Sequence, residues 1–226
     1  MDELSAEIKE LSSIGCKYGT DKVPNGFMPH YVRMFSCIRE KAKSIVEIGV
    51  LDGASIKTWR DYFPNAFIYG IDCYDKKYLD GNRLKTFVAD QSERNQLAAV
   101  IEEMGNVDII IDDGGHSMKQ QQVSLGFLFP FVKHGGLYVI EDLHTSVIQP
   151  EFFNDTSTDN TTERLLRDLA NGIRPKSDFM TDEEIDCVLK ETKKCSVEIT
   201  RIASEEEVDQ YGPFAVTIGF LEKTEY

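Results

Sequence analysis

The sequence predicts an α/β fold, a Rossmann-like doubly wound sheet that is mostly parallel. Short, near-continuous runs of β-branched and aromatic residues recur along the chain, which is the pattern of strands covered on both faces. Helical stretches separate these runs, and such alternation is typical of parallel strands joined by right-handed crossovers. Turn-forming residues such as Gly105 and Gly135 stand before new runs, where a helix must end.

Five buried strands are expected in the first two thirds of the chain. In chain order they are 44–50, 66–72, 85–90, 107–113 and 136–142, and helices are expected between them at 54–62, 95–104 and 119–132. The N-terminal residues 1–40 are expected to form a helical segment with a Gly- and Pro-containing middle at 18–29.

The pattern changes after the fifth strand. Residues 147–195 are expected to be an insertion over the top of the sheet, with helices at 162–171 and 182–193. The runs 196–200 and 214–220 alternate in polarity and are predicted to close the sheet as an edge pair. All of these elements are expected to form one domain, residues 1–226.

Size and charge restrict the class of function. A chain of 226 residues with 41% hydrophobic and 28% charged residues has ordinary globular composition and can bury a core without disulfides or metals. Lys plus Arg is 25 and Asp plus Glu is 39, so the net charge is 25 − 39 = −14. A field of this sign repels phosphate backbones, so we expect no nucleic-acid partner and no anionic membrane. A neutral or cationic small molecule is compatible with it.

The cysteines and the N-terminus indicate a reduced, cytoplasmic protein. The five cysteines are odd in number and show no CxxC spacing, which argues against a disulfide framework and against structural zinc. The first ten residues are acidic, and no run approaches the ~20 apolar residues of a membrane span. The glycosylation sequons at 154–156 and 160–162 are therefore interpreted as chance matches.

Glycines and acids follow the first three predicted strands, where open α/β sheets bind ligands. Gly49 and Gly53 after the first strand would let the backbone approach a ligand. Asp72 ends the second strand, about twenty residues later, where an acid typically accepts ribose hydroxyls. Asp90 and Gln91 end the third strand and could meet an adenine edge. Each feature alone equally fits a tight turn or a helix cap, but three in register favour a nucleotide-like cofactor.

The fourth and fifth strands end in acids, at Asp113 and at Glu141 and Asp142. Carboxylate-only ligands suit a hard cation such as Mg²⁺, Mn²⁺ or Ca²⁺. The alternative is that one or two of these acids cap helices or pair with Arg or Lys. His116 follows in a Gly-Gly turn, which favours a general base. His144 is the rival candidate for that role.

These motifs together resemble a known family. The matching residues lie at 17–22, 47–53, 70–72, 90–91, 111–116 and 135–146. They resemble a class I S-adenosylmethionine-dependent methyltransferase and, more narrowly, the metal-dependent sugar O-methyltransferases of the mycinamicin type. The rhamnosyl O-methyltransferase and cephalosporin hydroxylase-like group is a looser match. We expect this chain to lack the extra N-terminal domain of the macrolide enzymes, so their oligomeric state need not hold, although a homo-oligomer is compatible with the sequence.

The resemblance implies a role for each matching residue. The cofactor-binding set, which would hold S-adenosyl-L-methionine, comprises Glu47, Gly49, Gly53, Asp72, Asp90, Gln91, Asp112, Thr20 and Lys22. Asp113, Glu141 and Asp142 would hold Mg²⁺ or Mn²⁺, and Asp113 and His116 would be the catalytic residues. His116 would take the proton from the hydroxyl of a small-molecule or glycan acceptor. We expect the two glycines before it to make the turn mobile, so that His116 points away without acceptor. Residues 1–40 would act as a lid, and 147–195 would shape the acceptor site.

Three other functions remain open at this point. A nucleotide-dependent oxidoreductase would use a similar sheet, but the GxGxxG spacing is absent. An O-methyltransferase of a non-sugar diol would satisfy the same chelation argument. A catalytically silent binding protein would keep the fold, although the retained acids and His116 argue against decay.

Overall fold

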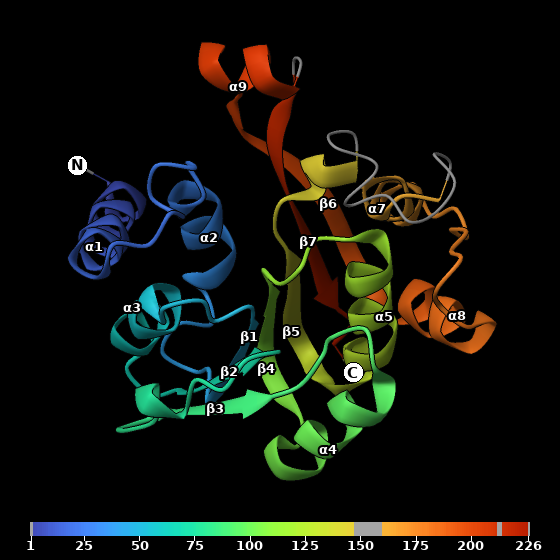
Figure 1. The fold of residues 1–226 in the computed structure, drawn as a ribbon, viewed down its shortest axis with the longest axis horizontal. Helices are drawn as coiled ribbons and strands as arrows, with labels where there is room; N and C mark the ends of the chain where they lie inside the picture. The colour runs from blue at the N-terminus through green and yellow to red at the C-terminus, as the bar shows by residue number, and fades with distance from the viewer. Residues whose placement is uncertain (1, 147–159, 212–213, 226) are drawn as a thin grey trace.

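The protein forms a single seven-stranded sheet in a computed structural model that describes residues 2–146, 160–211 and 214–225. The strand order is β3-β2-β1-β4-β5-β7-β6 (Figure 1). The bounds are β1 Ser44–Ile48, β2 Phe67–Asp72, β3 Leu84–Val88, β4 Val107–Asp112, β5 Val132–Ile140, β6 Thr192–Ile202 and β7 Ala215–Lys223. The first five strands are parallel, and β7 runs antiparallel to both β5 and β6. The predicted fold class is therefore confirmed.

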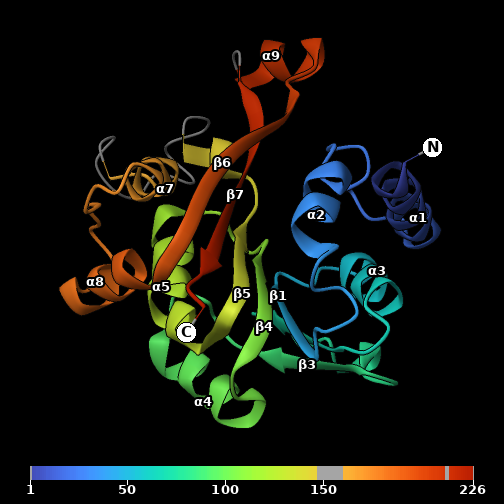
Figure 2. The same cartoon turned by 180° about the vertical axis from the view of Figure 1, so that it is seen from behind.

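Helices cover both faces of the sheet (Figures 1 and 2). One face carries α1 Glu3–Tyr18, α2 Met28–Phe35 and α3 Ala54–Tyr62; the other carries α4 Arg94–Met104, α5 Met118–Leu128, α7 Thr162–Ala170 and α8 Asp182–Glu191. Short 3-10 turns lie at η1 Lys77–Leu79, η2 Phe129–Phe131 and η3 Leu143–Ser146. The helix α9 Glu205–Tyr211 lies at the far end of the β6–β7 hairpin, beyond the body of the sheet.

The buried strands explain the near-continuous apolar runs. Every residue of β1 is buried, and its side chains alternate between two cores. Ile45 packs with α1, α2 and α3, whereas Val46 and Ile48 pack with α4 and α5. A strand that is covered on both faces has no solvent side on which polar residues could alternate.

Some element ends differ from the sequence prediction. The helix expected at 119–132 ends at Leu128, because Pro130 lies in the following 3-10 turn and cannot continue the α-helical hydrogen-bond ladder. The helix expected at 182–193 ends at Glu191, because residues from Thr192 onward pair with β7. Tertiary pairing here overrides local helix preference.

The N-terminal segment is helical as predicted, in two helices joined by a turn. Asp2 caps α1 by accepting from the Ser5 amide, and Gly19 ends it in the left-handed conformation with φ of 76°. The turn from Gly19 to Phe27 then leads into α2, over the carboxyl ends of the strands. The first part of the predicted insertion, 147–159, lies outside the described residues, as does the sequon at 154–156.

The sequence predicts neither a disulfide framework nor a membrane span. All five cysteines are free thiols. Among the described residues, every helix is too short or too polar to cross a lipid bilayer.

Candidate active site

A cavity of about 570 Å³ opens at the carboxyl ends of the parallel strands. The ends of β1, β2, β3 and β4 contribute Gly49, Asp72, Asp90 and Asp113, which were all predicted from the sequence. His116 and Asp142 line the same cavity, and Gly19, Thr20 and Asp21 close it from the N-terminal segment. Residues after β1 to β3 and residues after β4 and β5 thus line one cavity, as expected for a ligand site at the carboxyl ends of parallel strands.

Gly49 allows the turn after β1 to touch the turn after β4. Its φ is 87°, and an ideal Cβ there would lie 1.9 Å from the Asp113 carbonyl oxygen. The turn then passes through Leu51, also left-handed with φ of 50°, to Gly53, which precedes α3 with φ of 85°. The glycine pattern seen in the sequence thus reflects a backbone contact as well as a turn.

Asp72 anchors this turn while lining the cavity. Its Oδ2 accepts from the amides of Val50 (3.0 Å) and Leu51 (3.1 Å), and its Oδ1 accepts from the Tyr74 amide (2.9 Å). Lys76 Nζ lies 3.8 Å from Oδ2, a pairing that sequence reasoning missed. A carboxylate has about four acceptor positions, so one on Oδ1 stays available for a ligand hydroxyl.

Asp90 and Gln91 form one wall of the cavity. Asp90 Oδ1 accepts from the amide and hydroxyl of Ser92, both at 2.8 Å. Asp112 is 1% exposed and lies behind the wall, where Gln91 and Ser124 donate to it. Burial raises the pKa of Asp112 to about 6, and these hydrogen bonds oppose the rise. Asp112 therefore holds the neighbouring turn from within rather than facing the cavity.

The turn that carries His116 is anchored by two glutamines. Gln91 Oε1 accepts from the Gly115 amide at 2.9 Å and lies where a Cβ of Gly114 would stand. The Gln120 carboxamide fills the corresponding position at Gly115, while Gln120 caps α5 together with Ser117. Gly114 and Gly115 therefore allow the two glutamine side chains to pack directly against the backbone of the turn.

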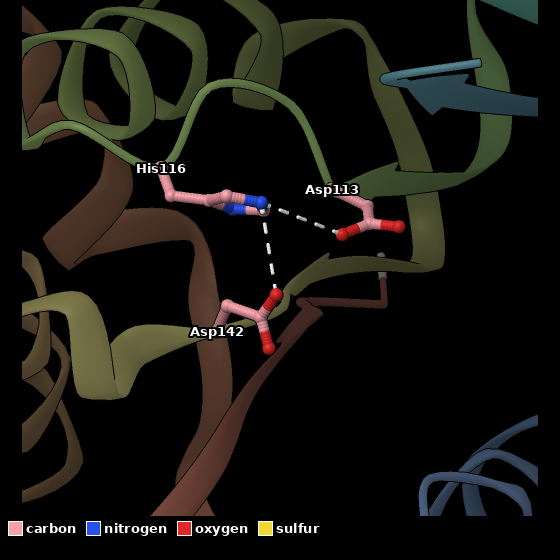
Figure 3. Close-up of side chains that lie close together, drawn as sticks. All are labelled: Asp113, His116 and Asp142. Carbon is pink, nitrogen blue, oxygen red and sulfur yellow. Dashed lines mark ion pairs between the residues drawn. The ribbon is translucent and has the colours of Figure 1, made fainter. Parts of the chain in front are cut away.

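His116 points into the site, contrary to our expectation that it would turn away. Its Nε2 lies 3.6 Å from Asp142 Oδ2 and 4.0 Å from Asp113 Oδ1 (Figure 3). His116 and Asp142 both have left-handed backbones, with φ of 61° and 53°. Burial raises the pKa of Asp142, the His116 charge opposes this rise, and Asp113 adds to it. The anchored turn explains why the imidazole is already directed at the carboxylates.

Lys22 does not face the cavity, where the resemblance placed it as a donor contact. Its ammonium is fully buried and lies 2.5 Å from Asp113 Oδ2, 2.7 Å from Glu141 Oε1 and 3.4 Å from Glu47 Oε1. Burial alone would lower the pKa of Lys22, but the three carboxylates outweigh it and raise that pKa well above its ordinary value. The open alternative, that one or two of the predicted metal ligands pair with Arg or Lys, therefore holds for Asp113 and Glu141.

Glu47 and Glu141 lie behind the cavity in the same buried network. Ser55 and Trp59 donate to Glu47, and the Tyr31 hydroxyl donates to Glu141. Burial raises the pKa of Glu47 to about 7, with the Lys22 charge opposing, and burial also raises the pKa of Glu141. Sequence reasoning missed Tyr31, since nothing in an apolar helix marks one tyrosine as a carboxylate partner.

The rival histidine, His144, is not among the residues that line the cavity. His144 stacks on Phe214, with ring centroids 5.1 Å apart and planes at 7°. Its Nδ1 lies 3.8 Å from Asp142 Oδ1. Burial lowers the pKa of His144 to about 4, and the charges of His116 and Arg201 add to this effect. His144 is therefore neutral near neutral pH and is a poorer base than its position suggests.

Comparison with known proteins agrees with this geometry. No family model matches the chain. Mycinamicin VI 2''-O-methyltransferase of Micromonospora griseorubida is 38% identical over 146 residues, which are 61% of this chain and 37% of that protein. Demethylmacrocin O-methyltransferase of Streptomyces fradiae is 34% identical over 177 residues, 73% of this chain and 45% of that protein. The chain thus spans less than half the length of these relatives.

Solved structures of MycE methyltransferase from the mycinamycin biosynthetic pathway superpose on nearly the whole chain. The complex with Mg and SAH has a TM-score of 0.71 at 29% identity and covers 95% of this chain and 55% of that one. The complex that also holds mycinamycin VI has a TM-score of 0.70. The chain belongs to the class I S-adenosylmethionine-dependent methyltransferases. The sequence resemblance to this methyltransferase family is therefore confirmed, and the cavity at the strand ends is its candidate active site.

Proposed function

We propose that this methyltransferase-family chain transfers a methyl group from S-adenosyl-L-methionine to a hydroxyl of a sugar or glycoside, with Mg²⁺ or Mn²⁺ bound. The observation that carries the proposal is the single cavity that joins a glycine-turned donor pocket to a histidine flanked by two carboxylates. Methyl transfer is an in-line displacement, so donor and acceptor must lie in contact along one line. A cavity with the donor pocket at one end and the histidine and carboxylates at the other meets that requirement.

The donor end fits S-adenosyl-L-methionine. Gly49 and Gly114 line the cavity, so a ligand can approach their backbones, and both pack too closely against neighbouring protein atoms to carry a Cβ. Asp72 keeps an acceptor position for a ribose hydroxyl. Asp90 and Gln91 would meet the adenine end, and Thr20 would close the pocket as part of the proposed lid, residues 1–40. The acidic surroundings suit a cationic sulfonium better than the neutral thioether product.

The acceptor end fits a hard divalent cation. The predicted ligands are Asp113, Glu141 and Asp142, which supply the oxygen atoms that Mg²⁺ prefers. Asp113 and Asp142 reach the cavity, and Glu141 lies further in with its Oε1 held by Lys22 and Tyr31. When bound, such an ion supplies positive charge that lowers the pKa of a nearby acceptor hydroxyl.

His116 would accept the hydroxyl proton at Nε2. This atom already faces the two carboxylates that flank the cavity. Asp142 and Asp113 would orient the imidazole for this transfer. The Gln91 and Gln120 contacts keep the turn from swinging the base away from the acceptor. The residues 147–195 would shape the acceptor pocket, and the five free thiols suit the cytoplasm as the place of action.

The test is methyl transfer from labelled S-adenosyl-L-methionine to a panel of glycosides, with Mg²⁺ present. We expect label in a glycoside product, and no label after chelation of the ion. Labelling of a non-sugar diol but of no glycoside would redirect the proposal to that acceptor class. Donor binding by calorimetry without turnover of any acceptor would leave a binding protein.

A further inference from the structure

A lysine joins the two turns that form the donor end of the cavity. Lys76 Nζ donates to the Leu51 carbonyl oxygen at 2.6 Å and lies 3.8 Å from Asp72 Oδ2. The Lys76 side chain is 15% exposed and lines the cavity, as do Leu51 and Asp72. Lys76 has no role in the steps of the proposed function, so its place in the donor pocket calls for a separate account.

The backbone of Leu51 is held from both sides by residues at and after the end of β2. Its amide donates to Asp72 Oδ2 at 3.1 Å, and its carbonyl oxygen accepts from Lys76. Because the Leu51 side chain is 79% exposed, its packing does little to hold the residue in place. The position of Leu51 therefore depends on its backbone hydrogen bonds.

The hydrogen bond within the turn does not select the conformation of Leu51. This residue has φ of 50°, in the left-handed region, which costs free energy for any residue with a side chain. The Gly53 amide closes the turn by donating to the Val50 carbonyl oxygen at 2.8 Å. The same closing bond forms in type I and type II turns, where the residue at the position of Leu51 has a negative φ. The contacts with Asp72 and Lys76 therefore decide between these forms.

We propose that Lys76 is a positioning residue that holds Leu51 in its left-handed conformation and so keeps the turn 49–53 in the shape that receives the donor. The inference rests on the proposed function for the identity of the donor, S-adenosyl-L-methionine. The hold of Lys76 on the turn is a property of the chain itself.

The charge of Lys76 also favours a role within the protein over a contact with the donor. S-adenosyl-L-methionine carries a positive sulfonium, and an ammonium directed at it would weaken binding by repulsion. The Lys76 ammonium is instead engaged by the Leu51 carbonyl oxygen and lies beside the Asp72 carboxylate. The lysine thus supports the pocket without presenting its charge to the ligand.

Loss of the lysine should reach the donor through the population of the turn. Without Lys76, Leu51 gains free energy by relaxing to a negative φ, which reorients the peptide groups next to Gly49 and its own amide at Asp72. Only the molecules that keep the left-handed turn then bind the donor. The apparent dissociation constant rises in inverse proportion to their fraction.

The first test is donor affinity, measured by calorimetry on the full chain without acceptor. We expect Lys76→Met to weaken S-adenosyl-L-methionine binding about tenfold, the size of one hydrogen bond from a charged donor. Where turnover is measured, the Michaelis constant for the donor should rise while kcat at saturating donor stays unchanged. Lys57→Met is the control, since Lys57 reaches the Asp52 carbonyl oxygen of the same turn only at 3.5 Å. An equal loss of affinity in Lys57→Met would overturn the proposal.

A double-variant cycle separates the hold on Leu51 from a direct effect of charge. Glycine adopts a positive φ without steric cost, so the turn in Leu51→Gly needs less support. Most of the loss of donor affinity caused by Lys76→Met should therefore disappear in the Leu51→Gly background. Equal losses in the two backgrounds would mean that the lysine acts on the donor itself, and this result would also overturn the proposal.

Amide hydrogen exchange tests the turn without any ligand. The amides of Val50 and Leu51 donate to Asp72 and should exchange faster with solvent in Lys76→Met than in the wild type. Unchanged exchange of both amides would contradict the role of Lys76. A wild type that binds no S-adenosyl-L-methionine would count against the proposed function, whereas faster exchange in Lys76→Met would still support the hold of the lysine on the turn.

Discussion

The donor and acceptor ends of the cavity are built in different ways. The donor end consists largely of backbone, which is shaped by Gly49 and held by hydrogen bonds from two backbone amides to Asp72. The acceptor end consists of charged side chains, with His116 between Asp113 and Asp142. Shape therefore fixes one end and electrostatics the other, so substitutions should affect donor binding and turnover separately.

The largest expected effect of a single change is at His116, the proposed general base. His116→Ala should lower kcat by roughly 10²–10⁴-fold, the usual contribution of a general base. Affinity for S-adenosyl-L-methionine, measured by calorimetry, should stay unchanged, because the imidazole lies at the acceptor end. His144→Ala is the control, and a greater loss of kcat in that variant would move the role of base to His144.

Removal of the ion is the next test of the acceptor end. A chelator should abolish turnover and Mg²⁺ should restore it, whereas Asp142→Asn should stay inactive at any Mg²⁺ concentration. Donor binding, followed by calorimetry in the same samples, should survive both treatments. Full turnover in excess chelator would show that the two carboxylates serve His116 alone.

At the donor end, Gly49→Ala should destabilise the protein by about 1–3 kcal/mol or more, because the new Cβ combines backbone strain with a clash. Gly19→Ala is a matched control, since Gly19 has a similar φ of 76° but no atom within 4 Å of its ideal Cβ. Urea unfolding of the two variants separates the clash from the strain. Equal losses of stability in the two variants would show that the contact between Gly49 and Asp113 does not contribute to the effect.

The Asp72 carboxylate gives a smaller effect on the donor end. Asp72→Ala should weaken donor binding by about 1–3 kcal/mol, the cost of unpaired buried polar contacts. Asp72→Asn keeps one oxygen acceptor and should lose less. Calorimetry with the donor measures both, and an affinity unchanged in Asp72→Ala would exclude Asp72 from the pocket.

The smallest expected effect concerns the proposed lid, residues 1–40, and depends on pH. Burial opposes ionisation of Asp61, but hydrogen bonds from Lys17, Tyr18 and Arg60 lower its pKa from 3.8 to about 2. A carboxyl whose pKa is lower when folded stabilises above its unfolded pKa. That stability should be lost as pH falls from about 4 to about 2. Asp61 is partly exposed, so we expect a loss well under 1 kcal/mol. Urea unfolding of Asp61→Asn should show a weaker acid dependence over this range.

The sequence predicts residues at both ends of the cavity for the same physical reason. Gly49, Asp72 and Asp90 lie at the ends of consecutive strands, and the order of a parallel sheet brings such ends together. The alternation of strand-like and helix-like segments predicts the parallel sheet in the same way. The two C-terminal runs of alternating polarity predict its antiparallel edge. The sequence also indicated that Asp113, His116 and Asp142 converge, because neighbouring strands carry them.

The buried contacts of Lys22 with the acids behind the cavity could not be predicted in the same way. Lys22 and Tyr31 come from the N-terminal segment, and their contacts with Glu141 join residues more than a hundred positions apart. No local pattern distinguishes a lysine that turns inward from one that faces solvent. The ends of α5 and α8 were also misjudged, because sheet pairing and the 3-10 turn at Pro130 decide where those helices end.

Leu51, His116 and Asp142 hold a backbone conformation that costs side-chain-bearing residues about 1 kcal/mol or more each, and all three line the cavity. Leu51 is also 79% exposed. These backbone conformations thus lower the stability of the fold at the place where the reaction is proposed to occur. A search for more thermostable variants would therefore select glycine at these positions first, and such variants would trade activity for stability.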